Sequence, residues 1–263
     1  MPLDLPDIHP FSNTAAQGQP PAQTVAEQVG ALNTALRHHS ATDVLRHAMT
    51  AVPKLALVSS FGAESAVLLH LASMVNRDLS VLFIDTELLF AETLVYQQEL
   101  TERLGLRNVT ILRSDELRTQ DPDNTLHQRD TDACCALRKT RPLQHALAGF
   151  DGWISGRKRF QSGSRAALEH FEHESRDGAG PDRIKVNPLA YWDPSDIQTY
   201  MVENRLPRHP LVARGYPSIG CAPCTSPVKE GEDPRAGRWR ETQKDECGIH
   251  FVNGKMVRAG DTT

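Results

Sequence analysis

Short apolar segments alternate with longer amphipathic segments between residues 55 and 112, and this alternation constrains the fold more than any other feature. We expect strands at residues 55–58, 81–84 and 109–112, with helices at residues 63–75 and 91–104 between them. Strands that alternate with helices of this length form a parallel sheet covered by helices on both faces. Ligands of such sheets bind beyond the carboxyl ends of the strands. The sequence therefore predicts a three-layer α/β fold with a site at those strand ends.

Further elements are expected on both sides of this region. Asp193 is a good N-cap and Pro194 a good first helical residue, so they mark the start of one of the later helices. The other elements expected are helices at residues 24–38, 42–49, 136–148 and 195–204 and a strand at residues 153–155. The chain thus divides into a disordered arm (1–22), one α/β domain (23–240) and a mobile C-terminal tail (241–263).

Charge and hydropathy exclude several classes of protein. The 263 residues include 29 Lys+Arg and 33 Asp+Glu, a formal net charge of −4, which argues against a generally basic nucleic-acid binder. No apolar run approaches the roughly 20 residues that a membrane-spanning helix needs. The N-terminal residues have no basic and apolar regions typical of a secretory signal, so we expect a cytoplasmic protein without a membrane or nucleic-acid partner.

The first candidate site is the turn Ser59-Ser60-Phe61-Gly62 between the first strand and its helix. Hydroxyl and backbone N–H groups at a helix N terminus favour phosphate or sulfate. The turn lacks the Gly-Lys-Ser/Thr ending of a triphosphate-binding loop and the Gly-x-Gly-x-x-Gly pattern of a dinucleotide site. Asp85 follows the second strand, at the same edge of the sheet. An ordinary βα turn with serine caps has the same composition, so this segment alone leaves both interpretations open.

The second candidate site consists of two cysteine pairs, Cys134-Cys135 and Cys221-x-x-Cys224. Four thiolates suit zinc or an iron–sulfur cluster. The adjacent pair, expected at a helix start, needs a constrained geometry to serve one centre. Arg138 and Lys139 would offset the negative charge of a thiolate centre. The alternative is that the first pair is inert and the second pair is redox-active.

Cys247 is the fifth cysteine and lies in the expected tail. A mobile cysteine could reach a distant site and leave it again, although an isolated tail cysteine is often incidental. Basic residues are also concentrated at 156–165 and at Arg235 and Arg238, as a polyanionic substrate would require. Each basic group taken singly is equally consistent with a solvated loop.

These features together resemble the assimilatory adenylyl-sulfate (APS) reductases of the thioredoxin-dependent phosphoadenylyl-sulfate (PAPS) reductase family. The resemblance rests on the two cysteine pairs and on the ending Lys-x-Glu-Cys-Gly-Ile-His at residues 244–250, and it extends over about residues 55–250. It implies an adenine-nucleotide α-hydrolase-like fold and a nucleophilic Cys247. It also implies one 4Fe–4S cluster per chain, held by Cys134, Cys135, Cys221 and Cys224, with Lys139 linking this cluster to the substrate.

The resemblance also indicates which residues bind the substrate. With Asp85 included for its place at a strand end, they are Ser59, Ser60, Phe61, Gly62, Asp85, Gly156, Arg165, Arg235, Arg238 and His250. Two departures from the family pattern stand out. Glu87 occupies a position where relatives often have glycine, and the spacer between Arg238 and Cys247 is slightly short.

The reaction implied is reduction of APS to sulfite and AMP in assimilatory sulfate reduction for cysteine biosynthesis. An S-sulfocysteine on Cys247 would be resolved by thioredoxin or glutaredoxin, and family habit suggests a homo-oligomer. A cluster-bearing PAPS reductase is the nearest alternative. An ATP-dependent RNA thiolase is disfavoured by Phe61, Glu64 and the net acidity. A non-catalytic metal-binding module would leave Cys247 and the paired arginines without a role.

Overall fold

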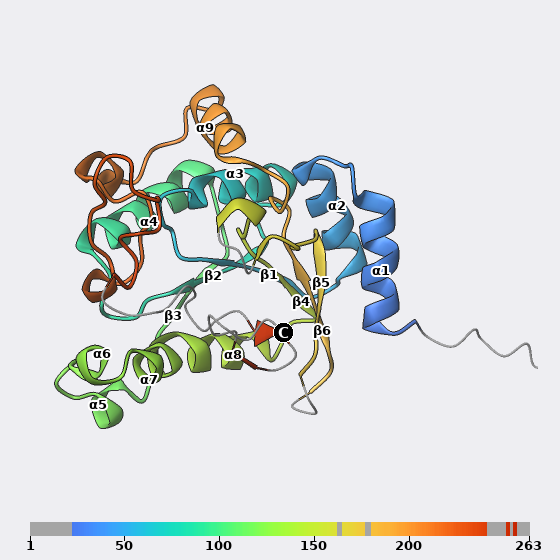
Figure 1. The fold of residues 1–263 in the computed structure, drawn as a ribbon. Coiled ribbons are helices and arrows are strands. Elements are labelled where there is room, and N and C mark those ends of the chain that lie inside the picture. Colours follow the sequence, from blue (N-terminus) through green and yellow to red (C-terminus); the bar gives the residue numbers. More distant parts are fainter. Residues whose placement is uncertain (1–22, 162–164, 177–179, 241–250, 253–254, 257–263) are drawn as a thin grey trace, which may run out of the picture.

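The computed structural model describes residues 23–161, 165–176, 180–240, 251–252 and 255–256. Its centre is a six-stranded sheet in the order β3-β2-β1-β4-β6-β5, in which β5 alone runs antiparallel to its neighbour (Figure 1). These strands are β1 (Leu55–Ser59), β2 (Ser80–Ile84), β3 (Val109–Leu112), β4 (Gly152–Ile154), β5 (Phe171–Glu174) and β6 (Arg183–Val186). A separate two-stranded sheet consists of β7 (Phe251–Val252) and β8 (Lys255–Met256).

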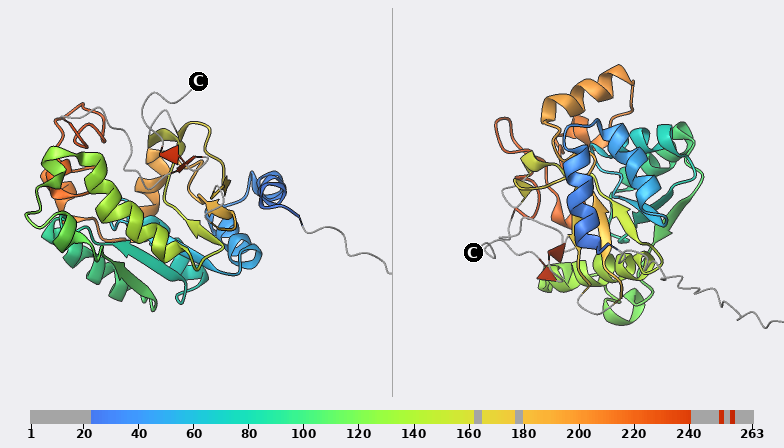
Figure 2. Two further views of the ribbon diagram at one scale, coloured as in Figure 1. Left: turned by 90° about the horizontal axis from the view of Figure 1, so that it is seen from below. Right: turned by 90° about the vertical axis from the view of Figure 1, so that its right-hand side faces the viewer.

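Helices cover both faces of the sheet (Figures 1 and 2). Seen from below, α7 and α8 cross in front of the strands. The α-helices are α1 (Val25–Leu36), α2 (Ala41–Ala51), α3 (Ser65–Val75), α4 (Ala91–Leu104), α5 (Leu117–Gln120), α6 (Leu126–Arg129), α7 (Thr131–Cys135), α8 (Arg141–Leu147) and α9 (Pro194–Glu203). The shorter elements are the π-helix η1 (Ala136–Thr140) and the 3-10 turns η2 (Arg159–Gln161), η4 (Pro210–Arg214) and η5 (Ala222–Cys224).

Alternate residues of β1 face two separate apolar cores. Leu55 and Leu57 pack with α1 to α4 and α9 in the larger core. Ala56 and Val58 face the smaller core, which includes residues of α8. All five residues of β1 are buried, as expected for a central parallel strand covered on both sides. The predicted three-layer α/β fold is therefore confirmed.

Most predicted elements agree closely with the structure. The helix at 91–104 and the strand at 109–112 have the predicted bounds, and Asp193 caps α9 with a reciprocal capping box. The predicted start of the helix at 136–148 is wrong, because the helical segment begins at Thr131. There the Asp130 side chain accepts a hydrogen bond from the Ala133 N–H at 2.9 Å.

The hairpin of β5 and β6 was not expected from the sequence. Its strands carry charged side chains at positions that are buried, namely Glu174, Arg183 and Lys185. Charged residues usually mark exposed positions, so this segment carries no clear signal of a buried strand. This hairpin forms the edge of the sheet beside β4.

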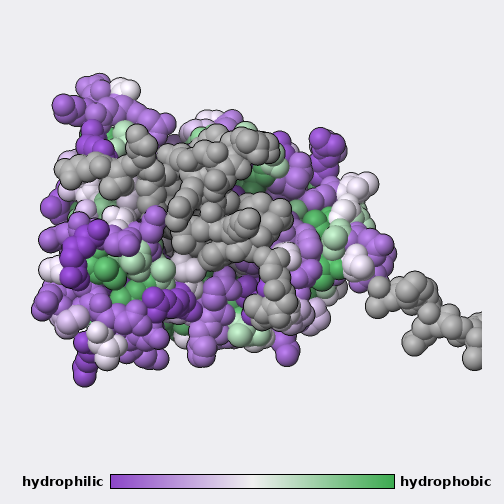
Figure 3. Space-filling model, turned by 60° about the horizontal axis from the view of Figure 1, so that its bottom comes forward, coloured by the Kyte–Doolittle hydropathy of each residue, from purple (hydrophilic) through white to green (hydrophobic). Residues whose placement is uncertain are grey.

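The surface is largely polar on the face shown in Figure 3, where small apolar areas lie among hydrophilic side chains of the described residues. None of the described helices has both the length and the apolar character needed to cross a membrane. The predicted arm (1–22) and most of the predicted tail (241–263) lie outside the described residues.

Candidate active site

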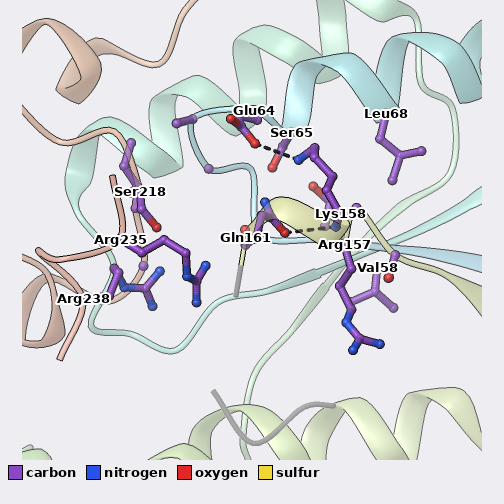
Figure 4. A pocket seen from close by; sticks show the side chains of 18 of the residues that line it. Val58, Glu64, Ser65, Leu68, Arg157, Lys158, Gln161, Ser218, Arg235 and Arg238 are labelled. Carbon is purple, nitrogen blue, oxygen red and sulfur yellow. Dashed lines mark hydrogen bonds and ion pairs between the residues drawn. The ribbon is translucent and has the colours of Figure 1, made fainter. Parts of the chain in front are cut away.

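The carboxyl ends of β1, β2 and β4 open into one cavity of about 280 Å³ (Figure 4). β1 lies between β2 and β4 in the sheet, so the connections on its two sides diverge at this point. Open α/β sheets bind ligands where the connections diverge in this way. Apolar residues line part of the cavity, among them Leu68, Leu69, Ile84 and Trp153. The cavity therefore combines apolar and polar walls, as small-molecule sites generally do.

The turn predicted to bind an anion lies at the cavity, with one exception among its side chains. Ser59, Ser60 and Gly62 line the cavity. Phe61 has a positive φ of 47° and points into the core, where its ring lies 5.2 Å from that of Phe83. The Phe61 N–H donates to Ser59 Oγ at 3.1 Å, which holds the turn in this shape. Phe61 is therefore absent from the described cavity lining, although its neighbours Ser60 and Gly62 belong to it.

The N terminus of α3 faces the same space. Glu64 and Ser65 line the cavity, and no side chain caps this helix end. The Glu64 carboxylate instead accepts a hydrogen bond from Lys158 Nζ at 2.7 Å (Figure 4). Burial lowers the pKa of Lys158, Glu64 opposes that shift, and Arg165 and Arg235 add to it. The cations around the cavity are therefore close enough to influence one another.

Basic side chains outnumber acidic ones in the cavity lining. The acidic residues in the described lining are Glu64 and Asp233. The basic residues are Lys139, Arg157, Lys158, Arg165, Arg235 and Arg238. This excess of positive charge in a partly desolvated space suits a ligand with more than one negative charge.

The end of β2 differs from the prediction. The Asp85 side chain does not line the cavity; its Oδ2 lies 2.8 Å from Arg113 Nη2, and its Oδ1 accepts the Glu87 N–H at 2.9 Å. Glu87 adopts the left-handed region with a φ of 58°, the conformation for which glycine is best suited. Thr86 lines the cavity instead. Asp85 thus shapes the turn that presents Thr86.

The structure brings the two cysteine pairs together. Cys134 and Cys135 end α7, and Cys221 and Cys224 flank the turn η5. All four are free thiols, three of them buried and Cys224 half-buried. Burial raises the pKa of Cys134 to about 11, with further contributions from Cys135, Cys221 and Cys224. The predicted position of the first pair at a helix start is wrong, since helical structure continues through both residues into η1.

Cys221 differs from Cys134 and Cys224, because its pKa is lowered whereas theirs are raised. Burial opposes its ionisation, but Lys139, the Thr86 hydroxyl and Arg238 together lower its pKa. Thr86 Oγ1 lies 3.2 Å from Cys221 Sγ, and the Lys139 side chain also hydrogen-bonds to this sulfur. Because Thr86, Lys139 and Cys221 all line the cavity, the cysteine group adjoins it directly. Among the described residues, no group of three or more His, Cys, Asp or Glu side chains is placed to hold a single metal ion.

Arg238 is held between the cavity and the cysteines. Its backbone forms an isolated bridge with Thr225, and its guanidinium carbon lies 4.4 Å from the centroid of the Trp239 ring. A Cβ atom at Gly220 would lie 2.3 Å from Arg238 Nη2, so glycine leaves room for this side chain. Gly220 thus permits the position that Arg238 adopts.

The remaining predicted substrate-binding residues divide by location. Gly156, Arg165 and Arg235 line the cavity with Arg238. Cys247 and His250 lie outside the described residues. Sequence reasoning noted the basic run 156–159 but did not assign Arg157 and Lys158 to the site. Both residues closely follow the end of a predicted strand, and this position could have indicated that they belong to the site.

Comparisons with known proteins agree with this geometry. Residues 54–227 match the family model described as "Phosphoadenosine phosphosulfate reductase domain". An "Adenosine 5'-phosphosulfate reductase" of Chelativorans sp. is 50% identical over 199 residues, 75% of this chain and 79% of the relative. A protein of the same name from Mesorhizobium japonicum is 49% identical over 212 residues, 80% of this chain and 81% of the relative. A "Phosphoadenosine 5'-phosphosulfate reductase" of Gloeobacter violaceus is 42% identical over 202 residues, 75% of this chain and 82% of the relative.

Solved structures show the same architecture. The phosphoadenylyl-sulfate reductase of Candida auris, solved as a phosphate complex, is similar with a TM-score of 0.67 and 27% identity, covering 79% of this chain and 98% of that one. The FMN adenylyltransferase of Candida glabrata has a TM-score of 0.54 at 14% identity, over 92% of this chain and 79% of that one, and shares the fold. The match over residues 54–227 includes the β1–α3 turn and both cysteine pairs. The chain therefore belongs to the phosphoadenosine phosphosulfate reductase family.

Proposed function

We propose that this protein reduces APS to sulfite and AMP in assimilatory sulfate reduction, which supplies cysteine biosynthesis. The observation that carries the proposal is a cation-lined cavity with Cys221 in its wall and the other three cysteines close enough to Cys221 and to one another to affect their ionisation. Family membership restricts the chemistry, and the relatives from Chelativorans and Mesorhizobium are named as reductases of APS rather than PAPS. We place the reaction in the cytoplasm, where protein dithiols are kept reduced.

The substrate would bind with its phosphosulfate among the basic residues of the cavity. Ser59, Ser60 and the backbone of the following turn offer hydroxyl and N–H groups at the N terminus of α3. Arg165, Arg235 and Arg238 would balance the negative charge of the phosphosulfate. The apolar wall at Leu68 and Leu69 would contact the nucleoside.

Cys247 is proposed as the nucleophile of the first step. Its thiolate would attack the sulfur atom of APS, forming an S–S bond while the bond between sulfur and the phosphate oxygen breaks. The bonding electrons leave with AMP, and Cys247 becomes S-sulfocysteine. The arginines would reduce the repulsion between the thiolate and its anionic target.

A dithiol protein such as thioredoxin or glutaredoxin is proposed for the second step. One of its thiolates would attack Cys247 Sγ, so that sulfite leaves and a mixed disulfide forms. The second thiol of the partner then releases Cys247, leaving an oxidised partner. The two electrons that convert the sulfonyl sulfur to sulfite therefore come from the dithiol protein.

We further propose that Cys134, Cys135, Cys221 and Cys224 hold one 4Fe–4S cluster. In support, the four thiols come from two segments and influence one another's ionisation, and Lys139 and Arg238 lower the pKa of Cys224 against the effect of burial. Each cysteine of such a cluster binds its own iron, so the four sulfurs surround the cluster without converging on one ion. When bound, the cluster would supply a compact negative charge beside Lys139 and a rigid link between the two cysteine segments.

The test is intact-protein mass after anaerobic mixing with APS or PAPS, separately and without reductant, followed by peptide mapping. We expect a mass increase of one sulfonate group on Cys247 with APS, and none in a Cys247→Ser variant. An adduct from PAPS alone would assign the protein to PAPS reduction, as in the Gloeobacter relative. No adduct from either compound, with iron still bound, would overturn the covalent mechanism.

Electron paramagnetic resonance during a single turnover tests separately whether the cluster takes part in electron transfer. We expect its oxidation state to stay constant, because the electrons come from the dithiol protein. A change of oxidation state in step with sulfite release would contradict this assignment.

A further inference from the structure

Three residues on one wall of the cavity occur at alternate positions of the chain. They are Trp153, Ser155 and Arg157, in and directly after β4. Side chains two residues apart on an extended chain point to the same side. Each forms a hydrogen bond to a side chain of the β5–β6 hairpin or of the residue that follows it. The bonds are Trp153 Nε1 to Glu174 Oε2 (2.9 Å), Ser155 Oγ to Asn187 Oδ1 (2.5 Å) and Arg157 Nη1 to Glu172 Oε2 (2.9 Å).

Glu172 is the centre of this set of contacts. Its Oε2 accepts hydrogen bonds from Arg157 at 2.9 Å and from Asn187 Nδ2 at 2.8 Å. Lys185 Nζ lies 3.9 Å from the same oxygen, and the sheet register places Lys185 directly opposite Glu172. Opposite charges at facing positions stabilise an antiparallel pair. Asn187 and Lys185 therefore help to hold the Glu172 carboxylate in place, in addition to its contact with Arg157.

Arg157 has little freedom of its own in this position. Its side chain is 9% exposed, and it leaves the loop in the opposite direction from Lys158 (Figure 4). A buried guanidinium requires a fixed anionic partner, because an unpaired buried charge is costly. Glu172 supplies that partner, and Arg157 is one of the residues that line the cavity.

A second arginine–glutamate pair in the same segment provides a natural comparison. Arg159 Nη2 lies 2.9 Å from Glu169 Oε1, the same distance as in the Arg157–Glu172 pair. Arg159 does not line the cavity; its guanidinium carbon lies 4.0 Å from the centroid of the Tyr191 ring. The two pairs thus share their chemistry and differ in whether the arginine borders the cavity.

We propose that Glu172 is a positioning residue that directs the Arg157 guanidinium into the cavity, where Arg157 binds the phosphosulfate of the substrate. The hairpin that sequence analysis did not predict is then part of the active site's support. This inference rests on the proposed function, because it takes APS as the ligand of the cavity.

The test compares the steady-state kinetics of Glu172→Gln and Glu169→Gln with those of the wild-type protein. Glutamine keeps the size of the side chain but removes the charge that orients the arginine. We expect about a tenfold rise in KM for APS in Glu172→Gln, with a smaller change in kcat. Glu169→Gln should keep the wild-type KM. Thermal unfolding of each variant shows whether it is folded, and Glu172→Asp, which restores the charge, should recover part of the affinity.

A double-mutant cycle establishes whether Glu172 acts through Arg157. In an Arg157→Gln background, Glu172→Gln should raise KM no further. An additional rise in that background, or a wild-type KM in folded Glu172→Gln, would overturn the positioning role while leaving the proposed function intact. A wild-type protein that forms no sulfite from APS would overturn the proposed function and this inference with it.

Discussion

Arg138 and Asp121 form an ion pair that is almost completely buried, with Nη2 and Oδ2 2.6 Å apart and side chains 1% and 0% exposed. The same guanidinium donates to the Thr86 carbonyl oxygen through Nη1 at 2.7 Å. Thr86 in turn contacts Cys221. The pair therefore joins η1, which follows Cys135 directly, to the end of β2 and to the other cysteine segment.

Breaking this pair should destabilise the protein strongly. Asp121→Asn leaves the Arg138 charge buried without its carboxylate, and we expect a loss of about 3 kcal/mol in the free energy of unfolding. Glu116→Gln is the control, because Glu116 pairs with Arg141 at the surface, where both side chains are about half exposed. That change should cost about 1 kcal/mol or less. Urea denaturation of both variants checks the prediction, and equal losses would contradict it.

The hydroxyl of Thr86 should affect how firmly iron is retained. Thr86→Val removes the hydrogen bond at 3.2 Å from Cys221 Sγ, so the pKa of Cys221 should rise and its thiolate should bind metal less well. We expect faster loss of iron to a chelator, about tenfold, as is usual when a group that supports a metal ligand is removed. Thr86→Ser keeps the hydroxyl and should behave as wild type. Equal rates of iron loss in the valine and serine variants would show that the hydrogen bond has no such effect.

Lys185 should make the stability depend on pH above neutrality. Burial lowers its pKa to about 7, with Arg157 acting in the same direction and Glu172 and Glu174 opposing the shift. Between pH 7 and the ordinary lysine pKa of about 10.4, the unfolded chain therefore binds more protons than the folded one. This contribution makes the free energy of unfolding rise with pH over that range.

The variant Lys185→Met removes this contribution. The free energy of unfolding of the variant minus that of the wild type should be more positive at pH 6 than at pH 9. Chemical denaturation of both proteins at both pH values measures this difference. Lys54→Met, at an exposed lysine, is the control and should show no such difference. A pH-independent effect of Lys185→Met would mean that Lys185 keeps its proton throughout.

Gly220 should affect substrate binding more than stability. The Cβ atom of Gly220→Ala would lie 2.3 Å from Arg238 Nη2, and the guanidinium must move away from it. The end of a flexible side chain moves at little energetic cost, so the melting temperature should change little. If Arg238 binds the substrate as predicted, KM for APS should rise several-fold, about fivefold. Gly149→Ala, where no atom lies within 4 Å, should leave both quantities unchanged.

The strands β3, β2, β1 and β4 were predictable because they are largely apolar and the helices between them are regular. Residues 91–104 and 109–112 match the structure at both ends, and Asp193 caps α9 through a local side-chain hydrogen bond. Such signals depend on near neighbours in the sequence. The four cysteines suggested a shared metal centre by their residue type and pairing, with an inert first pair and a redox-active second pair as the alternative. Only the family resemblance specified a 4Fe–4S cluster held by all four.

Interactions between distant residues account for what was missed. Glu174 and Arg183 look like surface residues in the sequence, but Glu174 Oε2 lies 3.0 Å from Arg183 Nε in the interior. Asp85 lies at a strand end as predicted, but its carboxylate forms an ion pair with Arg113, which follows the end of β3. Only the fold determines which charged groups meet, so the sequence alone could not separate Thr86 from Asp85.

The π-helix η1 sets the rotation between two parts of one continuous helical segment. Before it lie Cys134 and Cys135, and after it lie Leu143 and Leu147 of α8, which pack in the smaller core. Deleting one residue between 136 and 140 would allow an ordinary helix but would turn everything beyond it by about 100°. The leucines could then no longer face the smaller core while Cys134 and Cys135 stay near Cys221 and Cys224. The number of residues in this turn is therefore constrained independently of their identity, and a one-residue deletion here should do more harm than most substitutions.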